Sequence, residues 1–150
     1  MKKNGFTLIE MMAVIAIIAV LTILLLPDVI DTFTETKDSN FITETRELCR
    51  TATNTYIRES VITMESKDYY KFNSDTTHAL PLTGRSEFNY YVKVNTDGAV
   101  VAMLVWDDNH VIKIVDSEGI QPKSITEQDF VENVDVTSMN VIKANTILSN

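Results

Sequence analysis

The chain has 150 residues, enough for an anchor segment and one domain of roughly a hundred residues but too few for two large domains. Its formal net charge of −8 argues against a nucleic-acid partner, because phosphate binding relies on clustered lysine and arginine side chains, which this sequence lacks. Cys49 is the only cysteine, which excludes an internal disulfide and a four-cysteine metal site. A secreted domain of this composition would depend on packing alone.

The segment from Phe6 to Pro27 is apolar enough to span a membrane. As a helix, its 22 residues would be about 33 Å long, close to the roughly 30 Å of a bilayer's hydrocarbon core. Basic residues precede the segment and acidic residues follow it: Lys2 and Lys3, then Asp28, Asp31 and Glu35. The positive-inside rule therefore predicts a single-pass protein with its N-terminus in the cytoplasm and the rest of the chain outside.

A cleavable secretory signal peptide begins similarly, with basic residues before an apolar stretch. Two features oppose this alternative. No small-x-small cleavage site follows the apolar run, which ends in Leu26, Pro27 and Asp28. Glu10 also lies near the start of the apolar segment, where an unpaired ionised carboxylate costs a few kcal/mol or more.

The segment from Lys2 to Glu10 resembles the signature of type IV prepilins. This superfamily comprises type IV pilins and the pseudopilins of type II secretion and competence systems. The resemblance rests on the Gly5-Phe6 junction, on Glu10 and on the apolar run that continues to Pro27. It is close over this N-terminal part and holds only in outline for the rest of the chain.

The resemblance implies that a prepilin peptidase cleaves between Gly5 and Phe6 and methylates the new amino group of Phe6. Residues 1–5 would be the leader peptide, and residues 6–27 would be a transmembrane helix that later forms the filament core. Glu10 would pair with the Phe6 amino group of the same or a neighbouring chain, a buried pair whose breakage costs about 3 to 5 kcal/mol. A hydrated Glu10 near the membrane interface is the alternative.

The same resemblance implies the partners and the location. The partners are further copies and other pilins in a filament, the prepilin peptidase, the membrane assembly platform with its ATPase, and membrane lipid before assembly. The protein would reside in the cytoplasmic membrane and then in an extracellular pilus or pseudopilus.

Pro27 cannot donate a backbone hydrogen bond to the carbonyl of Ile23, and its ring crowds that carbonyl. We therefore expect a kink or weak point between Ile23 and Leu26. The alternative is that Pro27 only marks the end of the membrane span.

Residues 28–66 contain no glycine or proline and predict that the helix continues. One face, about 140° wide, is mainly apolar and carries Ile30, Phe33, Phe41, Leu48, Ala52, Tyr56 and Ile62. Lys37, Thr45 and Glu59 interrupt it. We expect the second half of this helix to pack against a sheet. Cys49, at the edge of the face, is expected to be a small buried residue, with an intersubunit or redox role as the alternative.

Residues 67–150 are expected to form a globular head. Residues 67–87, with Pro81 and Gly84, predict a long packed loop. Alternating or continuous apolar patterns then predict three antiparallel strands over residues 88–95, 99–106 and 111–115. Turns are expected at Asp97-Gly98 and at Asp107-Asp108-Asn109. The predicted fold is α+β and pilin-like, a long N-terminal helix packed on a small antiparallel sheet.

The C-terminal part predicts less regular structure. Ser124-Ile125-Thr126-Glu127 has the pattern of a capping box that opens a short helix ending near Glu132. Residues 140–148 predict a strand or a packed tail. With one cysteine, no disulfide can close this end, unlike in many pilins that share the architecture.

Candidate chemistry is sparse. Some pseudopilins similar to this chain bind calcium in their C-terminal region, and four acidic residues lie near neighbouring predicted strand ends: Asp107, Asp108, Asp116 and Glu118. Because acidic residues are ordinary in turns and no EF-hand spacing occurs, no metal site is predicted. His78 and His110 have no ligand-spaced partner and are expected to be solvated loop residues. No catalytic or phosphate-binding motif occurs, so neither an enzyme nor a cofactor is predicted.

These patterns predict a structural filament subunit, a major or minor type IV pilin. The alternative within the superfamily is a pseudopilin of a type II secretion or DNA-uptake system. The alternative of another class is a membrane-tethered binding domain that does not polymerise. The sequence does not choose among adhesion, motility, secretion and DNA uptake.

Overall fold

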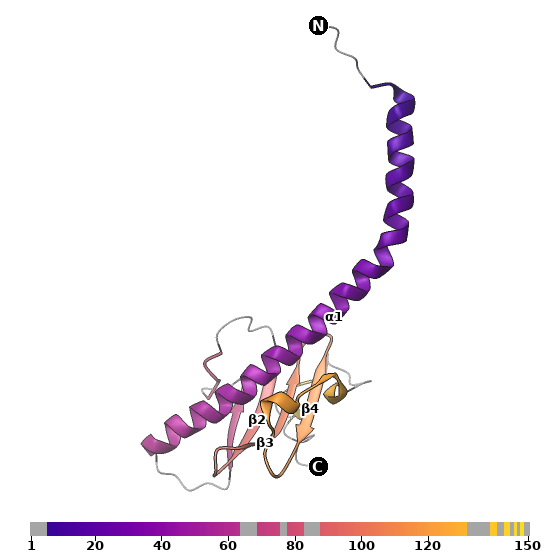
Figure 1. Ribbon diagram of the computed structural model, residues 1–150. Coiled ribbons are helices and arrows are strands. Elements are labelled where there is room, and N and C mark those ends of the chain that lie inside the picture. The colour runs from indigo at the N-terminus through magenta and orange to yellow at the C-terminus, as the bar shows by residue number, and fades with distance from the viewer. Residues whose placement is uncertain are drawn as a thin grey trace. The chain divides into compact units, whose positions relative to one another are not determined.

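The computed structural model describes residues 6–63, 69–75, 78–82, 88–131, 139–140, 143–144, 146 and 148. Figure 1 shows the elements, and the chain divides into two units, Met1–Lys37 and Asp38–Asn150, which are taken separately. In chain order the elements are helix α1 (Leu8–Thr63), strands β1 (Tyr69–Asn73), β2 (Asn89–Asn95), β3 (Val100–Trp106) and β4 (Val111–Val115), and the 3-10 turns η1 (Pro122–Ser124) and η2 (Glu127–Asp129).

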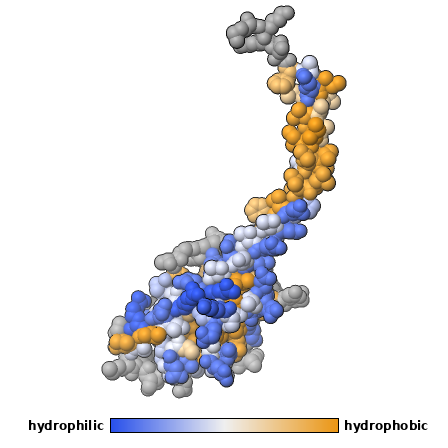
Figure 2. All heavy atoms as spheres, viewed as in Figure 1, coloured by the Kyte–Doolittle hydropathy of each residue, from blue (hydrophilic) through white to orange (hydrophobic). Residues whose placement is uncertain are grey.

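The first unit contains the N-terminal part of α1. Every described residue of α1 up to Lys37 is exposed, although most of those before Pro27 are apolar. Figure 2 shows these apolar side chains gathered along this part of the helix. By length and composition, α1 is apolar enough at its N-terminal end to cross a membrane, and none of that stretch is buried within the chain.

The second unit is built on a four-stranded antiparallel sheet with the order β1-β2-β3-β4. The three predicted strands are confirmed as β2, β3 and β4, within one residue of their expected limits. The second half of α1 lies across one face of this sheet (Figure 1). The predicted α+β, pilin-like fold is therefore confirmed, with one strand more than expected.

Strand β1 corrects the expectation of a loop over residues 67–87. Its backbone pairs with β2 from Tyr69 opposite Asn95 to Asn73 opposite Tyr91. Phe72 is 1% exposed and Tyr70 packs against the same core. Only two core-facing aromatics mark this strand, too short a pattern to separate it from its polar surroundings. Gly84, which was expected to lie in that loop, is outside the described residues.

The turn between β2 and β3 confirms the expectation at Asp97-Gly98. Gly98 has a φ of +85°, a left-handed conformation that favours glycine. The side-chain oxygen of Asn95 accepts hydrogen bonds from the amides of Asp97 and Ala99, at 3.0 and 2.9 Å. The sequence thus supplies both the backbone freedom and the cap that this turn requires.

The main core lies between α1 and the sheet. The predicted apolar face is confirmed over the second half of α1, where Phe41, Leu48 and Ala52 are buried and Tyr56 is partly buried. Thr45, an apparent interruption, is fully buried, and its hydroxyl donates to the carbonyl of Phe41 at 2.8 Å. This local bond satisfies the hydroxyl, so the threonine can join an apolar core. In the first unit, the Ile30 and Phe33 side chains are exposed.

A second cluster covers the opposite face of the sheet. Tyr91, Leu104, Trp106 and Val111 are buried there together with Ala144 from the C-terminal segment. The described residues at 143–144, 146 and 148 are helical, so the packed tail is confirmed for them and the alternative of a strand is wrong. The nearly continuous apolar pattern of β3 follows from this coverage, because both faces of a central strand are removed from water.

The expected helix after Ser124 is wrong. Two separate turns, η1 and η2, flank Ile125, which is fully buried and has an extended backbone conformation. Phe130 is extended as well and pairs with Ile112 of β4. The cap is also shifted, since the amide of Thr126 donates to Asp129 at 2.7 Å. Burial of Ile125 and pairing of Phe130 therefore outweigh local helix signals.

Candidate processing and assembly site

The N-terminal end of α1 is organised by Thr7 and Glu10. One carboxylate oxygen of Glu10 accepts hydrogen bonds from the amide and the hydroxyl of Thr7, both at 2.7 Å. The amide of Glu10 donates to the Thr7 hydroxyl at 3.4 Å. This reciprocal arrangement is a capping box, which satisfies backbone donors that a helix leaves unpaired at its start.

Thr7 was not among the predicted site residues. The signal is a threonine three residues before a glutamate, directly ahead of an apolar run, which is the usual pattern of a capping box. The predicted partner of Glu10 was instead the amino group of Phe6, of the same or a neighbouring chain, which exists only after cleavage. The structure shows that its carboxylate already has two donors within the isolated chain.

The predicted processing residues are only partly described. Gly5 lies outside the described residues, and Phe6 is 81% exposed. An exposed residue directly before the capped helix is accessible to another protein. The predicted pairing of Glu10 with a Phe6 amino group requires cleavage first, because an internal Phe6 carries no charged amine.

Pro27 lies inside α1, which is helical on both sides of it. Threonine hydroxyls nearby donate to carbonyls four residues earlier, Thr22 to Ile18 and Thr32 to Asp28, each at 2.8 Å. Such bonds compete with the helical ladder and slightly weaken it. The kink or weak point near Pro27 stays a prediction.

Comparison with known families gives one match. Residues 1–26 fit the prokaryotic N-terminal methylation motif. The chain is prepilin-like. This motif is typical of type IV prepilins and pseudopilins, which are structural proteins rather than enzymes. It implies processing by a prepilin peptidase and pilus-type assembly. No curated protein and no solved structure matches the chain.

In this prepilin-like chain, the four candidate calcium ligands are not brought together. Asp107 and Asp108 lie in the β3–β4 turn, whereas Asp116 and Glu118 follow β4 at the opposite end of the hairpin. The five residues of β4 separate the two pairs by about 16 Å. Among the described residues, no group of three or more His, Cys, Asp or Glu side chains could hold a metal ion.

The two histidines differ in environment. His78 is exposed, as expected, and its Nδ1 lies 3.2 Å from the Tyr70 hydroxyl. The expectation that His110 is a solvated loop residue is wrong. Its side chain is only 15% exposed and lies between Asp38 and Asp107. Sequence spacing could not indicate this, because Asp38 is 72 residues away in the chain.

Cys49 is buried, as expected. Its thiol lies 3.7 Å from the carbonyl of Ile120. Burial raises the pKa of the thiol to about 11, with a smaller opposing effect from the charge of Arg50. The thiolate, which is the reactive form, is therefore disfavoured at neutral pH.

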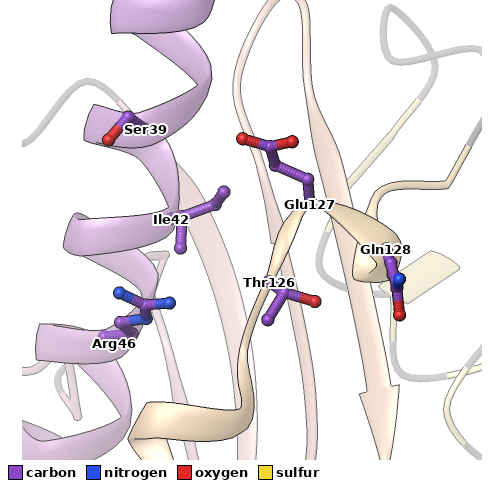
Figure 3. Close-up of a pocket in the computed structure, with 6 residues that line it drawn as sticks. All are labelled: Ser39, Ile42, Arg46, Thr126, Glu127 and Gln128. Atoms are coloured by element: carbon purple, nitrogen blue, oxygen red, sulfur yellow. The ribbon is translucent and has the colours of Figure 1, made fainter.

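A groove of about 380 Å³ lies between α1 and the segment around η2, and Figure 3 shows the six side chains that line it: Ser39, Ile42, Arg46, Thr126, Glu127 and Gln128. The guanidinium of Arg46 donates two hydrogen bonds to the carbonyl of Ile125, at 2.6 and 3.1 Å. Arg46 therefore fastens the segment before η2 to the helix. Among the described residues, no cysteine or histidine lines the groove.

Proposed function

We propose that this prepilin-like protein is a structural subunit, a major or minor type IV pilin, of a bacterial surface filament. One observation supports this most strongly: an apolar helix with no burial inside its own chain directly follows the Thr7–Glu10 cap within the methylation motif. Such a surface needs another apolar environment. Lipid supplies it before assembly, and the corresponding helices of other subunits supply it in a filament.

The proposed topology follows from charge. Lys2 and Lys3 stay on the cytoplasmic side, residues 6–27 span the membrane, and the folded head lies outside. Assembly would move the helix from the cytoplasmic membrane into the centre of an extracellular pilus. The proposed partners are further copies of this chain, other pilins, the assembly platform and its ATPase.

Processing is proposed to switch the role of Glu10. In the uncleaved chain its carboxylate caps α1 through Thr7. Cleavage between Gly5 and Phe6 creates a positively charged amine one residue before Thr7, even after N-methylation. A buried carboxylate then gains an ionic partner in the filament core, which offsets the cost of removing Glu10 from water.

The test is the intact mass and the N-terminal sequence of the protein purified from its own host membranes. A chain that begins with N-methylated Phe6 is the expected result. A chain that still begins with Met1, in cells with an active prepilin peptidase, would overturn the proposal and favour a tethered domain that does not polymerise.

A second measurement separates pilus from pseudopilus. Immunogold labelling of intact cells with an antibody against the head should decorate long surface filaments. If the processed chain is found only in short structures confined to the cell envelope, the pseudopilin alternative is correct instead.

A further inference from the structure

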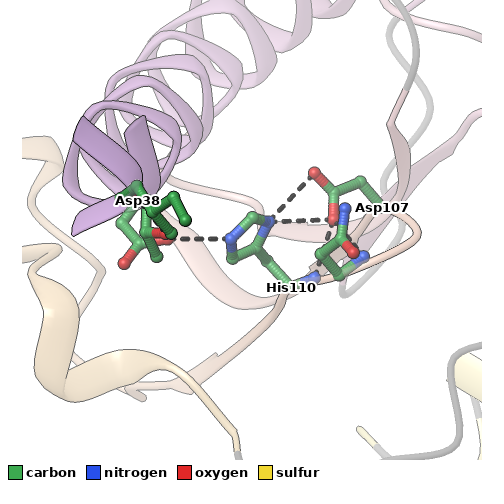
Figure 4. A network of polar contacts seen from close by, with 6 residues as sticks. Asp38, Asp107 and His110 are labelled. Atoms are coloured by element: carbon green, nitrogen blue, oxygen red, sulfur yellow. Dashed lines mark hydrogen bonds and ion pairs between the residues drawn. The ribbon is translucent and has the colours of Figure 1, made fainter. Parts of the chain in front are cut away.

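His110 joins the β3–β4 turn to helix α1 through both ring nitrogens. Nε2 lies 2.8 Å from a carboxylate oxygen of Asp38, and Nδ1 lies 3.0 and 3.1 Å from the two carboxylate oxygens of Asp107 (Figure 4). The three side chains are 15%, 30% and 20% exposed for His110, Asp38 and Asp107 respectively. These are partly buried contacts, which water and salt screen less than they screen surface pairs.

Aromatic rings hold the imidazole in place. Phe41 of α1 stacks on it with 5.1 Å between ring centroids and 28° between planes. Phe130, which follows η2, lies 5.6 Å away at 40°. Three parts of the head therefore meet at His110, and its ring has little freedom to turn away from either carboxylate.

The hydrogen-bonding capacity of the groups favours a charged ring. An ionised carboxylate can only accept hydrogen bonds, and a neutral imidazole has one N–H group. A neutral His110 would therefore leave one ring nitrogen facing a carboxylate without a proton between them. The imidazolium form donates to both Asp38 and Asp107 and satisfies all three groups.

We propose that Asp38, His110 and Asp107 form a proton-dependent clasp that ties α1 to the β3–β4 turn. The clasp is complete while His110 is protonated and both aspartates are ionised. When the ring loses its proton, one of the two charged hydrogen bonds is lost and α1 is held less firmly. The proposal concerns the head alone and does not require that the chain polymerise.

Asp107 determines how the clasp responds to low pH. Burial acts to raise the pKa of its carboxyl, but hydrogen bonds from the Asn109 amide and from the ring and amide of His110 lower it overall. A lowered pKa means that Asp107 stabilises the folded state above the unfolded pKa. That contribution is lost as the pH falls through the folded value. The clasp therefore weakens when Asp107 becomes protonated.

Other charged groups near the clasp are engaged elsewhere or exposed. In the turn, Asp108 is exposed. After Ile125, the carboxylate of Asp129 accepts a hydrogen bond from the amide of Thr126. Glu127 lines the same groove as Arg46. Among the residues that the structure describes, His110 forms ion pairs with Asp38 and Asp107. Because these carboxylates bind opposite ring nitrogens, no single metal position could serve all three side chains.

The clasp lies where the packed part of α1 begins. Asp38 is the first residue of the compact second unit. Phe41, less than one turn further along, is the first of the buried core side chains of the helix. Loosening the contact at Asp38 should therefore release the beginning of the packed part of α1 before the rest of the core is affected.

The first test is ¹⁵N NMR of the histidine ring in the full chain, held in detergent micelles. A His78→Gln background leaves His110 as the single histidine. At about pH 6 both ring nitrogens should show imidazolium shifts, and Asp38→Asn in the same background should lower the pH at which they change. A ring that is neutral at about pH 6 and unaffected by Asp38→Asn would overturn the proposal.

The second test measures stability by urea unfolding, with the fluorescence of Trp106, the only tryptophan, as the signal. Between about pH 5.5 and pH 8.5, the folding equilibrium constant of the His78→Gln chain should fall about tenfold more than that of its Asp38→Asn derivative. Parallel pH profiles for the two chains would overturn the clasp. The Asn side chain is similar in size to Asp and keeps an oxygen acceptor, so the comparison isolates the charge.

Discussion

Glu10 has one role in the isolated chain and a second, proposed role in the filament. In the isolated chain the Glu10 carboxylate accepts two hydrogen bonds from Thr7 and caps α1. In the proposed filament it would lie among apolar helices and pair with the amine that cleavage creates. The first role needs hydrogen-bond acceptors, whereas the second needs a negative charge.

Two substitutions of Glu10 separate these roles. Glu10→Gln keeps a capping side chain but removes the charge, and Glu10→Ala removes both. Both variants should be cleaved at Gly5-Phe6 nearly as well as the wild type, and both should give few filaments because the ionic partner is lost. Quantitative blots of processed chain in membranes and in sheared filaments would measure this. Normal filament yield from Glu10→Gln would show that capping, not charge, is what assembly requires.

Cys49 shows how burial alone changes the chemistry of a residue. Its thiol should react with iodoacetamide far more slowly in the folded chain than in urea at the same pH, because burial both blocks the thiol and raises its pKa to about 11. A time course of alkylation by mass spectrometry measures both rates. Equal rates would mean that the thiol is exposed.

The same shift predicts a pH dependence of stability. Because the pKa of Cys49 is higher in the folded chain than its ordinary value, its contribution to stability is complete below the unfolded pKa and is lost as the pH rises towards about 11. The free energy of unfolding of Cys49→Ala should therefore decline less than that of the wild type over this alkaline range. Urea titrations at several alkaline pH values would measure the difference.

Among the elements, β1 was missed and the C-terminal turns were misassigned for related reasons. Each is short, and each is decided by contacts with distant residues: β1 by its ladder with β2, and the turns by burial of Ile125 and the pairing of Phe130 with Ile112. The second half of α1 was predicted correctly because its apolar face repeats over several turns.

Strand β1 should contribute strongly to the stability of the head. Phe72→Ala should lower the free energy of unfolding by about 3 to 5 kcal/mol, because Phe72 is 1% exposed and its loss would leave a cavity. Phe33→Ala is the matched control, since Phe33 is 65% exposed and should change the value little. Urea unfolding followed by Trp106 fluorescence gives both numbers, and similar values for the two variants would contradict the assignment of β1 to the core.

At the scale of the whole molecule, the chain combines a helix segment without internal burial and a head with its own core. The division falls between Lys37 and Asp38, inside α1. The head is covered on both faces of its sheet, whereas the N-terminal part of α1 is exposed throughout. The N-terminal part of α1 therefore needs an apolar environment, whereas the head buries its apolar side chains in its own core.

A chain that begins at Asp38 should fold alone and remain monomeric without detergent, because the main and second core clusters lie beyond that point. The full chain should need detergent or lipid, since its apolar helix has no partner within the chain. Size-exclusion chromatography with light scattering would compare the two. Aggregation of the shortened chain would show that the first unit also stabilises the head.

The sequence by itself determined the features that depend on long or specific patterns. Each of these features has a sequence signal that repeats over many residues or is fixed by residue type. They are the N-terminal motif, the apolar span, the packed half of α1 and three strands. Gly98 and Asn95 likewise specify their turn locally, one through a left-handed φ and the other through its side-chain acceptor.

Only the tertiary structure decided features that join residues far apart in the chain. The burial of His110 depends on Asp38 and Phe41, and the order of the edge strand depends on β2. The physical reason is that side-chain environment is set by which elements pack against each other, and periodicity within one element does not encode its partners.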